Sequence, residues 1–314
     1  MSDNPVSGIN ASFGIGVESE EGVPVAADLF FSILSEDCGE TVELHETEAI
    51  SHHISGTPSV QEQAAPAVPA KIDNRVGMTC EPRFDHLPTL LGLIFGGNCG
   101  GSEYVPAAST SSFTVESGKV AEAESGKAVD QYAGSRVTKL TIKSETGGSL
   151  KITMEGVGRT VELIAGTTVD NSAWVSKAVM MHHGLTIAAG PGEIPTGQVY
   201  DIEVEIVREV DEDHFANSLT RIAAPPGRLL ATGKVTVPFN NDTAPIRTKI
   251  RLGTAFTLQP RWVGSDDETF DLPMNCKATA EPKKITDRGD QKIEIAFRCY
   301  QDGATNAIEA TLGS

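Results

Sequence analysis

Histidine is the residue type in this sequence best suited to bind a metal or to move a proton, and seven are present. Four of them form two adjacent pairs, His52–His53 and His182–His183. Adjacent residues of a strand or helix point in different directions, so neither pair sets two ligands on one ion. The sequence also has no HxxxH motif and no Cys/His cluster with zinc spacing. We therefore expect no metal site.

Other patterns of catalysis and cofactor binding are equally incomplete. The segment GLTIAAGPGEIPTG is rich in glycine but lacks the Gly-Lys-Ser/Thr of a phosphate-binding loop, and GIGVESEEG precedes no expected helix. No GxSxG motif occurs. Glu203 and Glu205 share one face of an expected strand, where carboxylates can do acid–base work. A solvated or channel-lining strand face is the better interpretation, so we expect no catalytic residue and no cofactor.

The balance of charge separates classes of function. The 314 residues include 43 acidic and 25 basic side chains, which gives a formal charge of −18. Phosphate binding relies on lysine and arginine, so this composition disfavours a protein that grips nucleic acid. Five cysteines without a CxxC motif indicate reduced thiols made in a cytoplasm. No signal peptide or membrane-spanning run is evident, so we expect a soluble product with no membrane partner.

Turn-rich composition and alternating strands predict a mainly β protein. Val76, Met78 and Cys80 alternate with other residues, which is typical of a half-buried strand. Leucines at helical spacing predict a short helix over residues 85–95 that ends at Gly96. We also expect a hairpin over residues 137–154, with SETGG as its connection, and an alternating strand over residues 199–210.

A strand–helix module occurs twice in the chain. The segment GMTCEPRFDHLPTLLGLIFGG from Gly77 aligns with GKVTVPFNNDTAPIRTKIRLG from Gly233, with the strand alternation shifted by one residue. Each copy continues into a Phe-Thr strand, a polar loop and a hairpin. This diverged duplication predicts two tandem β domains, each with a short flanking helix. We place the first domain at residues 1–165, with an N-terminal arm and a long Pro-rich loop, and the second at residues 166–314.

Several motifs are similar to those of one protein family. They are the strand ending in Glu-Pro-x-Phe-Asp at Glu81–Asp85, the Leu-x-x-Leu-Leu helix at Leu87–Gly97, the Phe-Thr-Val-Glu strand at Phe113–Glu116, and the strand and Gly-Gly hairpin at Tyr132–Gly148. Together with TGKVTVPF and the closing IEIAFRCYQDGATNAIEATL, they resemble the tail tube proteins, or major tail proteins, of long-tailed, siphovirus-type bacteriophages. Arg136 and the long Pro-rich segment near Pro66 depart from the family pattern.

The resemblance implies a structural virion protein built from two tail-tube-like β-sandwich or barrel domains. In that family, subunits form rings whose hairpins join into one barrel around a channel, and the rings stack into a tube through which DNA passes without specific binding. The implied partners are further copies of the chain and the tape-measure, tail-terminator and distal tail proteins. Because the chain is doubled, we favour a trimer with pseudo-sixfold symmetry over a hexamer. The expected location is the virion tail, after synthesis in the host cytoplasm.

Two groups of residues follow from this interpretation. Candidate contacts between subunits or between rings are Ile9, Phe13, Val60, Pro66 and Val68. Candidate acidic residues facing the channel are Glu145, Glu155, Glu203 and Glu205. An acidic wall would let DNA slide, because like charges prevent the contacts that release counterions. Two alternatives stay open: an inner-tube component of a contractile injection or secretion machine, and a two-domain β-sandwich binding module.

Overall fold

The structure is a computed structural model that describes residues 11–45, 68–97, 99–119, 129–165, 178–188, 199–279, 292–303 and 305–313. Within these residues the protein is mainly β, as predicted. The elements of the first half are β1 (Ala11–Val17), β2 (Leu29–Phe31), β3 (Ile33–Glu36), β4 (Gly39–His45), β5 (Val68–Cys80), α1 (Leu87–Phe95), β6 (Glu103–Tyr104), β7 (Phe113–Lys119), β8 (Val129–Glu145), β9 (Leu150–Gly158) and β10 (Thr160–Ile164). Those of the second half are β11 (Leu185–Ala188), β12 (Asp201–Val210), β13 (Pro226–Pro238), α2 (Ala244–Arg251), β14 (Phe256–Val263), β15 (Thr269–Asp271), β16 (Met274–Ala278), β17 (Lys292–Cys299) and β18 (Ala310–Gly313).

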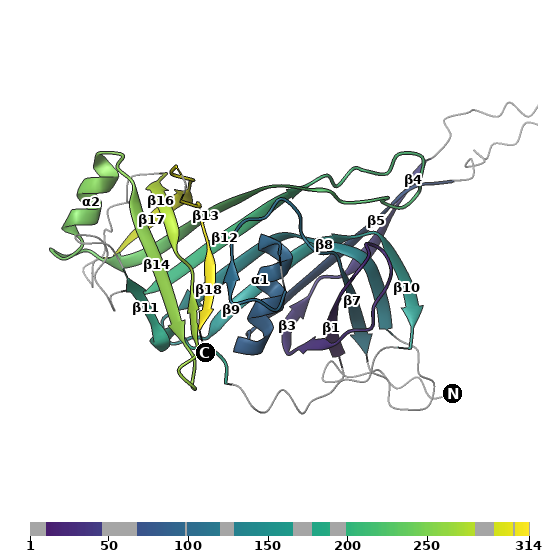
Figure 1. Ribbon diagram of the computed structural model, residues 1–314, viewed down its shortest axis with the longest axis horizontal. Helices are drawn as coiled ribbons and strands as arrows, with labels where there is room; N and C mark the ends of the chain where they lie inside the picture. Colours follow the sequence, from purple (N-terminus) through teal and green to yellow (C-terminus); the bar gives the residue numbers. More distant parts are fainter. Residues whose placement is uncertain are drawn as a thin grey trace, which may run out of the picture.

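One long antiparallel sheet runs through both halves of the chain. Its strand order is β4–β5–β9–β8–β12–β13–β17–β16–β14, and β3 also lies beside β5. The halves meet where β8 pairs with β12, and Leu140 there lies opposite Ile206. Figure 1 shows β8, β12 and β13 running along the long axis, with the β4–β5 hairpin extending at the end opposite α2. The two halves therefore share one sheet, a long-range pairing that the prediction of tandem domains did not include.

Two smaller antiparallel sheets pack beside the long sheet. The first has the order β2–β1–β7–β8–β10, and the second has the order β11–β14–β15–β18–β6. Strand β8 belongs to both the first small sheet and the long sheet: its first part pairs with β7 and β10, and its later part pairs with β9 and β12. Gly134, with φ +64°, lies where β8 passes from one to the other, in a backbone conformation that favours glycine. Since β6 comes from the first half and β18 from the second, a second strand pairing joins the halves.

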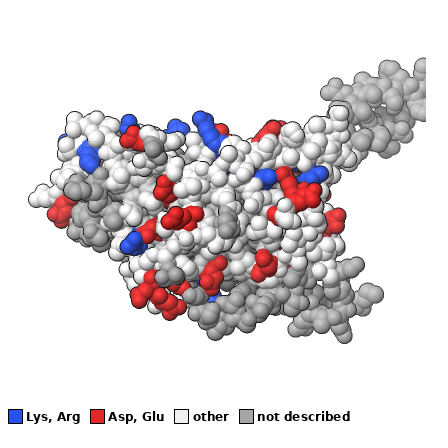
Figure 2. Space-filling model, in the orientation of Figure 1, with Lys and Arg blue, Asp and Glu red and all other residues white. Residues whose placement is uncertain are grey.

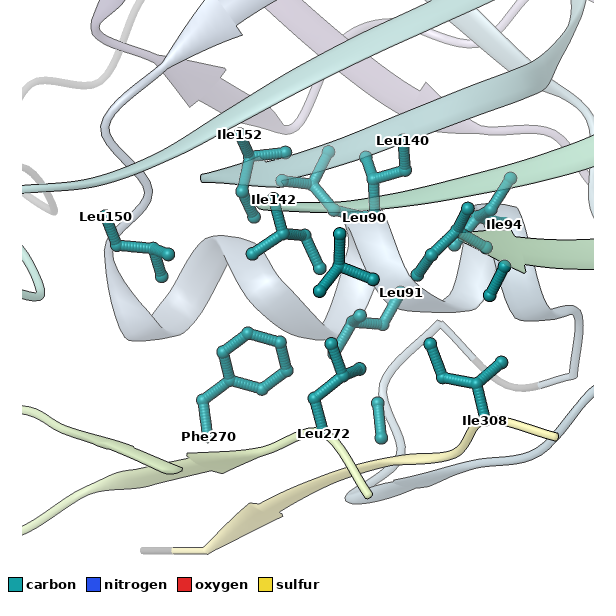
Figure 3. Close-up of a cluster of buried hydrophobic side chains, with 14 of the residues drawn as sticks. Leu90, Leu91, Ile94, Leu140, Ile142, Leu150, Ile152, Phe270, Leu272 and Ile308 are labelled. Carbon is teal, nitrogen blue, oxygen red and sulfur yellow. The ribbon is translucent and has the colours of Figure 1, made fainter. Parts of the chain in front are cut away.

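Helix α1 fills the apolar space between the long sheet and the second small sheet. Figure 3 shows its Leu90, Leu91 and Ile94 between two groups of apolar side chains. These groups are Leu140, Ile142, Leu150 and Ile152 from β8 and β9, and Phe270, Leu272 and Ile308 from the second half. Seven of the nine residues of α1 are buried, which is the pattern of a helix enclosed on every side. The predicted helix is confirmed and contributes to a core shared by both halves.

Helix α2 is amphipathic instead. Its Ile246 and Ile250 are buried, while Lys249 and Arg251 provide positive charge in its last turn, next to the negative end of the helix dipole. These two isoleucines align with Leu90 and Ile94 in the repeated module, and all four side chains are buried. The module thus places its apolar helical positions toward the core in both copies.

Candidate functional surface

The long sheet has one buried apolar face and one polar face. Alternation along each strand separates them: in β12, Ile202, Val204 and Ile206 are buried, and the residues between them point the other way. We call the second face the polar face. It is formed by Thr79, Lys139, Thr141, Lys143, Glu145, Lys151, Thr153, Glu155, Asp201, Glu203, Glu205, Thr232, Lys234, Thr236, Glu294 and Arg298. It spans both halves without interruption because β8 pairs with β12.

All four glutamates predicted to face a channel lie on the polar face, and each is close to a lysine. Glu155 pairs with Lys139 at 2.8 Å, and the same Nζ lies 4.0 Å from Glu205. Glu203 pairs with Lys234 at 3.1 Å. The hydrogen bond that Lys139 donates to Glu155 raises the pKa of the lysine, which therefore stays charged.

Glu145 forms its ion pair with Lys143, two residues earlier in β8. Their hydrogen bond raises the pKa of the lysine and lowers that of the glutamate. The structure thus brings the four predicted carboxylates together, but it surrounds them with cations that the prediction of an acidic wall did not include. The polar face is balanced in charge.

These charges are arranged in rows that cross the strands. The first row contains three lysines and one carboxylate. Its members, which are register partners on neighbouring strands, are Lys151, Lys143, Glu203 and Lys234. The next row is acidic, and its register partners are Glu145, Asp201, Thr236 and Glu294. Threonines form part of a third row, in which the hydroxyls of Thr79 and Thr153 are 2.9 Å apart. Figure 2 shows from one side that acidic and basic side chains are interspersed over the described surface.

One end of the long sheet is an edge with no neighbouring strand among the described residues, and at the other end only part of β16 is unpaired. At one end, β3 and β4 pair only with β5 there. Their apolar side chains Leu34, Val42 and Leu44 are 55%, 41% and 58% exposed. At the other end, β16 pairs with β14 only as far as Cys276, and its last two residues have β17 on one side alone. Unpaired edge strands with exposed apolar residues are places where another strand can add.

The predicted contact residues have varied positions. Ile9, Val60 and Pro66 lie outside the described residues, and Val68 begins β5, opposite His45. Phe13 in β1 is fully buried and packs edge-on against Phe31 with ring centroids 6.3 Å apart. Its side chain therefore belongs to the core, which differs from the expectation that it contacts another subunit. An aromatic residue in an alternating N-terminal strand can serve either purpose, and the sequence did not distinguish them.

Buried arginines connect distant segments, and no local pattern in the sequence indicated their burial. Arg221, in the loop between β12 and β13, donates to the Gly158 carbonyl at 2.7 Å and forms an ion pair with Asp73 of β5 at 2.5 Å. The same loop forms a second ion pair with β5, between Glu212 and Arg75 at 2.8 Å. These contacts hold the loop of the second half against the β4–β5 hairpin of the first.

Arg136, which departs from the family pattern, is also buried and pairs with Glu21 at 2.6 Å. Its guanidinium further donates to the hydroxyl of Thr110 at 3.0 Å. The departure therefore has a structural role within the chain, where it joins β8 to two loops.

The histidines form no metal-binding arrangement in the described part of the chain, where no group of three or more potential ligands occurs. The Nδ1 of His182 lies 2.8 Å from the hydroxyl of Ser144, and its Nε2 lies 3.1 Å from the Val199 carbonyl. Because a carbonyl can only accept, Nε2 donates to Val199, and in the neutral imidazole Nδ1 then accepts from Ser144. His52 and His53 lie outside the described residues. Neither described helix is long and apolar enough to cross a membrane.

Comparison with known protein families identifies the family of this chain. The model of the phage tail tube protein family matches residues 8–305, which is nearly the whole chain. The chain belongs to the phage tail tube protein family. A comparison with curated proteins finds no match. The tail tube protein is a structural component of the phage tail and not an enzyme, as its motifs predicted.

Proposed function

We propose that this tail tube protein assembles into closed rings that stack into a tube, with the polar face lining a channel for DNA. The observation that carries the proposal is the pairing of β8 with β12, which joins two similar sets of strands inside one chain. The sets are β4–β5–β9–β8 and β12–β13–β17–β16, and the antiparallel order is the same in each. A junction that already exists within the chain is a template for one between chains.

The template identifies the strands that meet at a ring joint. In the internal junction, the outer edge of β12 lies against the β8–β9 hairpin. The corresponding edge of the first set is β3 and β4, and the corresponding hairpin of the second set is β16–β17. We infer that β3 and β4 of one copy pair beside the β16–β17 hairpin of the next. Closing the sheet in this way satisfies backbone groups at both edges.

We infer the number of copies from the doubling of the strand set. If each set supplies one sixth of a closed sheet, three chains complete it, with alternate joints inside a chain and between chains. This supports a trimer with pseudo-sixfold symmetry over a hexamer. Tape-measure, tail-terminator and distal tail proteins would then meet the tube in its channel and at its ends.

Charge pairing on the polar face explains how DNA could move past it. Tight phosphate binding requires lysines and arginines that exchange counterions for phosphate. On the polar face, Lys139, Lys143 and Lys234 already have carboxylate partners. A phosphate would have to compete with these fixed carboxylates, so contacts with DNA stay weak and brief.

Assembly of the purified full chain tests the proposal. We expect sedimentation velocity to show a concentration-dependent trimer, and negative-stain microscopy to show rings or tubes, with tail initiator and tape-measure protein supplied if needed. In a variant with Leu34→Lys and Val42→Lys, the protein concentration needed for half-maximal assembly should rise at least about tenfold. The reason is that both substitutions place charge on the joining edge. Val105→Lys, at another half-exposed residue, is the matched control. A protein that stays monomeric at high concentration with those partners present would contradict the proposal.

A further inference from the structure

Two cysteines of the second half lie directly opposite each other on neighbouring strands. Cys276 of β16 and Cys299 of β17 are register partners, and their sulfur atoms are 4.0 Å apart. Both side chains are buried, and neither cysteine is part of a disulfide. They lie on the apolar face of the long sheet, near the edge-on pair of Phe256 and Phe297.

The hydrogen bonding around this pair determines its geometry. The Tyr300 amide donates to the Asn275 carbonyl at 3.0 Å, and the Thr279 amide donates to the Ala296 carbonyl at 3.0 Å. In an antiparallel ladder, hydrogen-bonded and non-hydrogen-bonded pairs alternate. Cys276 and Cys299 therefore form a non-hydrogen-bonded pair, in which the Cα atoms come to about 4.5 Å. That separation falls within the range that a disulfide spans, about 4.4–6.8 Å.

We propose that Cys276 and Cys299 are a site of oxidative cross-linking, at which a peroxide converts the two thiols into a disulfide between β16 and β17. The Cys299 thiolate attacks one peroxide oxygen, which breaks the O–O bond and leaves a sulfenic acid and one water molecule. The Cys276 thiolate then attacks that sulfur, the S–S bond forms, and the sulfenic oxygen leaves as a second water molecule. Two protein S–H bonds are oxidised, and one peroxide is reduced to water.

The order of attack follows from exposure. The side chain of Cys299 is 7% exposed to solvent, whereas that of Cys276 is fully buried. The oxidant therefore reaches Cys299 first. Rotation about χ1 can bring the sulfurs from 4.0 Å to bonding distance without moving the strands, because the Cα separation already suits a disulfide.

The other cysteines are poorly suited to the same chemistry. Cys80 lies opposite Ile33 and Ile152 in the neighbouring strands, so no cysteine faces it as Cys299 faces Cys276. Burial raises the pKa of Cys99. A tail component leaves the reducing cytoplasm with the virion, and structural disulfides persist outside it. The cross-link would fasten β16 to β17, at the last residue of β16 that also pairs with β14.

Peptide mapping of the intact protein tests this inference. Full-length protein is treated with hydrogen peroxide, its remaining thiols are blocked with N-ethylmaleimide under denaturing conditions, and non-reduced peptides are analysed by mass spectrometry. We expect two fewer maleimide adducts than in untreated protein and one linked peptide pair containing Cys276 and Cys299. Dithiothreitol should restore both adducts. The melting temperature should rise on oxidation, because the bond constrains the unfolded chain.

Single serine variants separate this site from general oxidation. Cys276→Ser and Cys299→Ser should each yield no linked pair, whereas Cys99→Ser should yield the same pair as the unchanged protein. If a variant fails to fold, the peptide map of the unchanged protein still decides. Cross-links between other cysteines, or sulfenic or sulfinic acid at Cys299 with no cross-link, would overturn the inference.

Discussion

The Nη2 of Arg208 donates a hydrogen bond to the carbonyl oxygen of Phe95 at 2.7 Å, which joins β12 of the second half to the last turn of α1. The same guanidinium donates to the carbonyls of Ile94, Ala107 and Gly227. The last carbonyls of a helix have no partner within the helix, and here a buried cation supplies one. One side chain thus satisfies the end of a helix that belongs to the other half of the chain.

Replacing Arg208 with methionine should destabilise the protein by roughly 2–4 kcal/mol, because several buried carbonyls lose their donor. Urea unfolding followed by circular dichroism measures the change. Arg228→Met is the matched control: Arg228 is 70% exposed and pairs with Glu209 at the surface, so its loss should change stability far less than the loss of Arg208. Equal losses in the two variants would show that the contacts of Arg208 contribute little.

Gly233 of β13 should not tolerate alanine. A Cβ atom there would lie 2.5 Å from the Glu203 carbonyl oxygen and 2.6 Å from the Phe297 ring, so the long sheet would have to shift. We expect a loss of roughly 2 kcal/mol or more in the free energy of unfolding. Gly39 of β4 is a fair comparison, because a Cβ there meets no atom within 4 Å. Thermal melts of both variants should show a lower transition only for Gly233→Ala.

Acid should weaken the fold through His86. This side chain is buried against Phe31, with ring centroids 4.6 Å apart, and burial lowers its pKa from 6.5 to about 4. Between these two values the unfolded chain binds a proton that the folded protein does not. Stability therefore falls as the pH drops from 6.5 toward 4, by up to roughly 3 kcal/mol, and this contribution is constant below that range.

His86→Asn tests the origin of this pH dependence. The amide oxygen of asparagine can still accept from the Arg83 amide, which the Nδ1 of His86 faces at 3.3 Å, but asparagine does not titrate. Urea midpoints at a series of pH values should slope less steeply between pH 6.5 and pH 4 in the variant. An unchanged slope would assign the effect to other groups.

Removing carboxylates from the polar face should make it hold DNA. In a variant with Glu145→Gln, Glu155→Gln and Glu203→Gln, the lysines that pair with these residues lose their partners. Assembled protein should then bind a short DNA duplex about tenfold or more tightly at low salt, with the gain lost as salt rises. Fluorescence anisotropy measures the affinity.

The control for that variant carries the same change in net charge at another place. Glu20, Glu103 and Glu162 are exposed and lie outside the polar face, so their replacement by glutamine should leave DNA binding nearly unchanged. Similar binding by both variants would mean that net charge, and not the polar face, controls contact with DNA.

The local elements were predictable because their signals are local. Val76, Met78 and Cys80 alternate in sequence and are buried together in β5, and the leucines of α1 point into the core at helical spacing. The one-residue shift in the repeated module is also real: Gly77 lies on the polar face of β5, while Gly233 opposes the buried Phe297. A period of two residues is enough to assign a face once a strand is recognised.

What the sequence left unpredicted depends on contacts between distant residues. Arginine is usually a surface residue, so nothing in the sequence around Arg208 or Arg221 indicates that a core surrounds them. The pairing of β8 with β12 requires knowing which strand lies beside which, and composition does not specify this. The four predicted glutamates do share a face, but their lysine partners become evident only from the register of neighbouring strands.

The junction between β8 and β12 has a further consequence for how the protein responds to dilution. Its two strands are tethered by a single chain, so each experiences the other at an effective concentration in the millimolar range or above. Diluting the protein cannot separate them without unfolding the sheet. In the proposed ring, a joint between two chains would have no such tether and would dissociate as the concentration falls. With two strand sets in one chain, the ring would have fewer joints that depend on protein concentration.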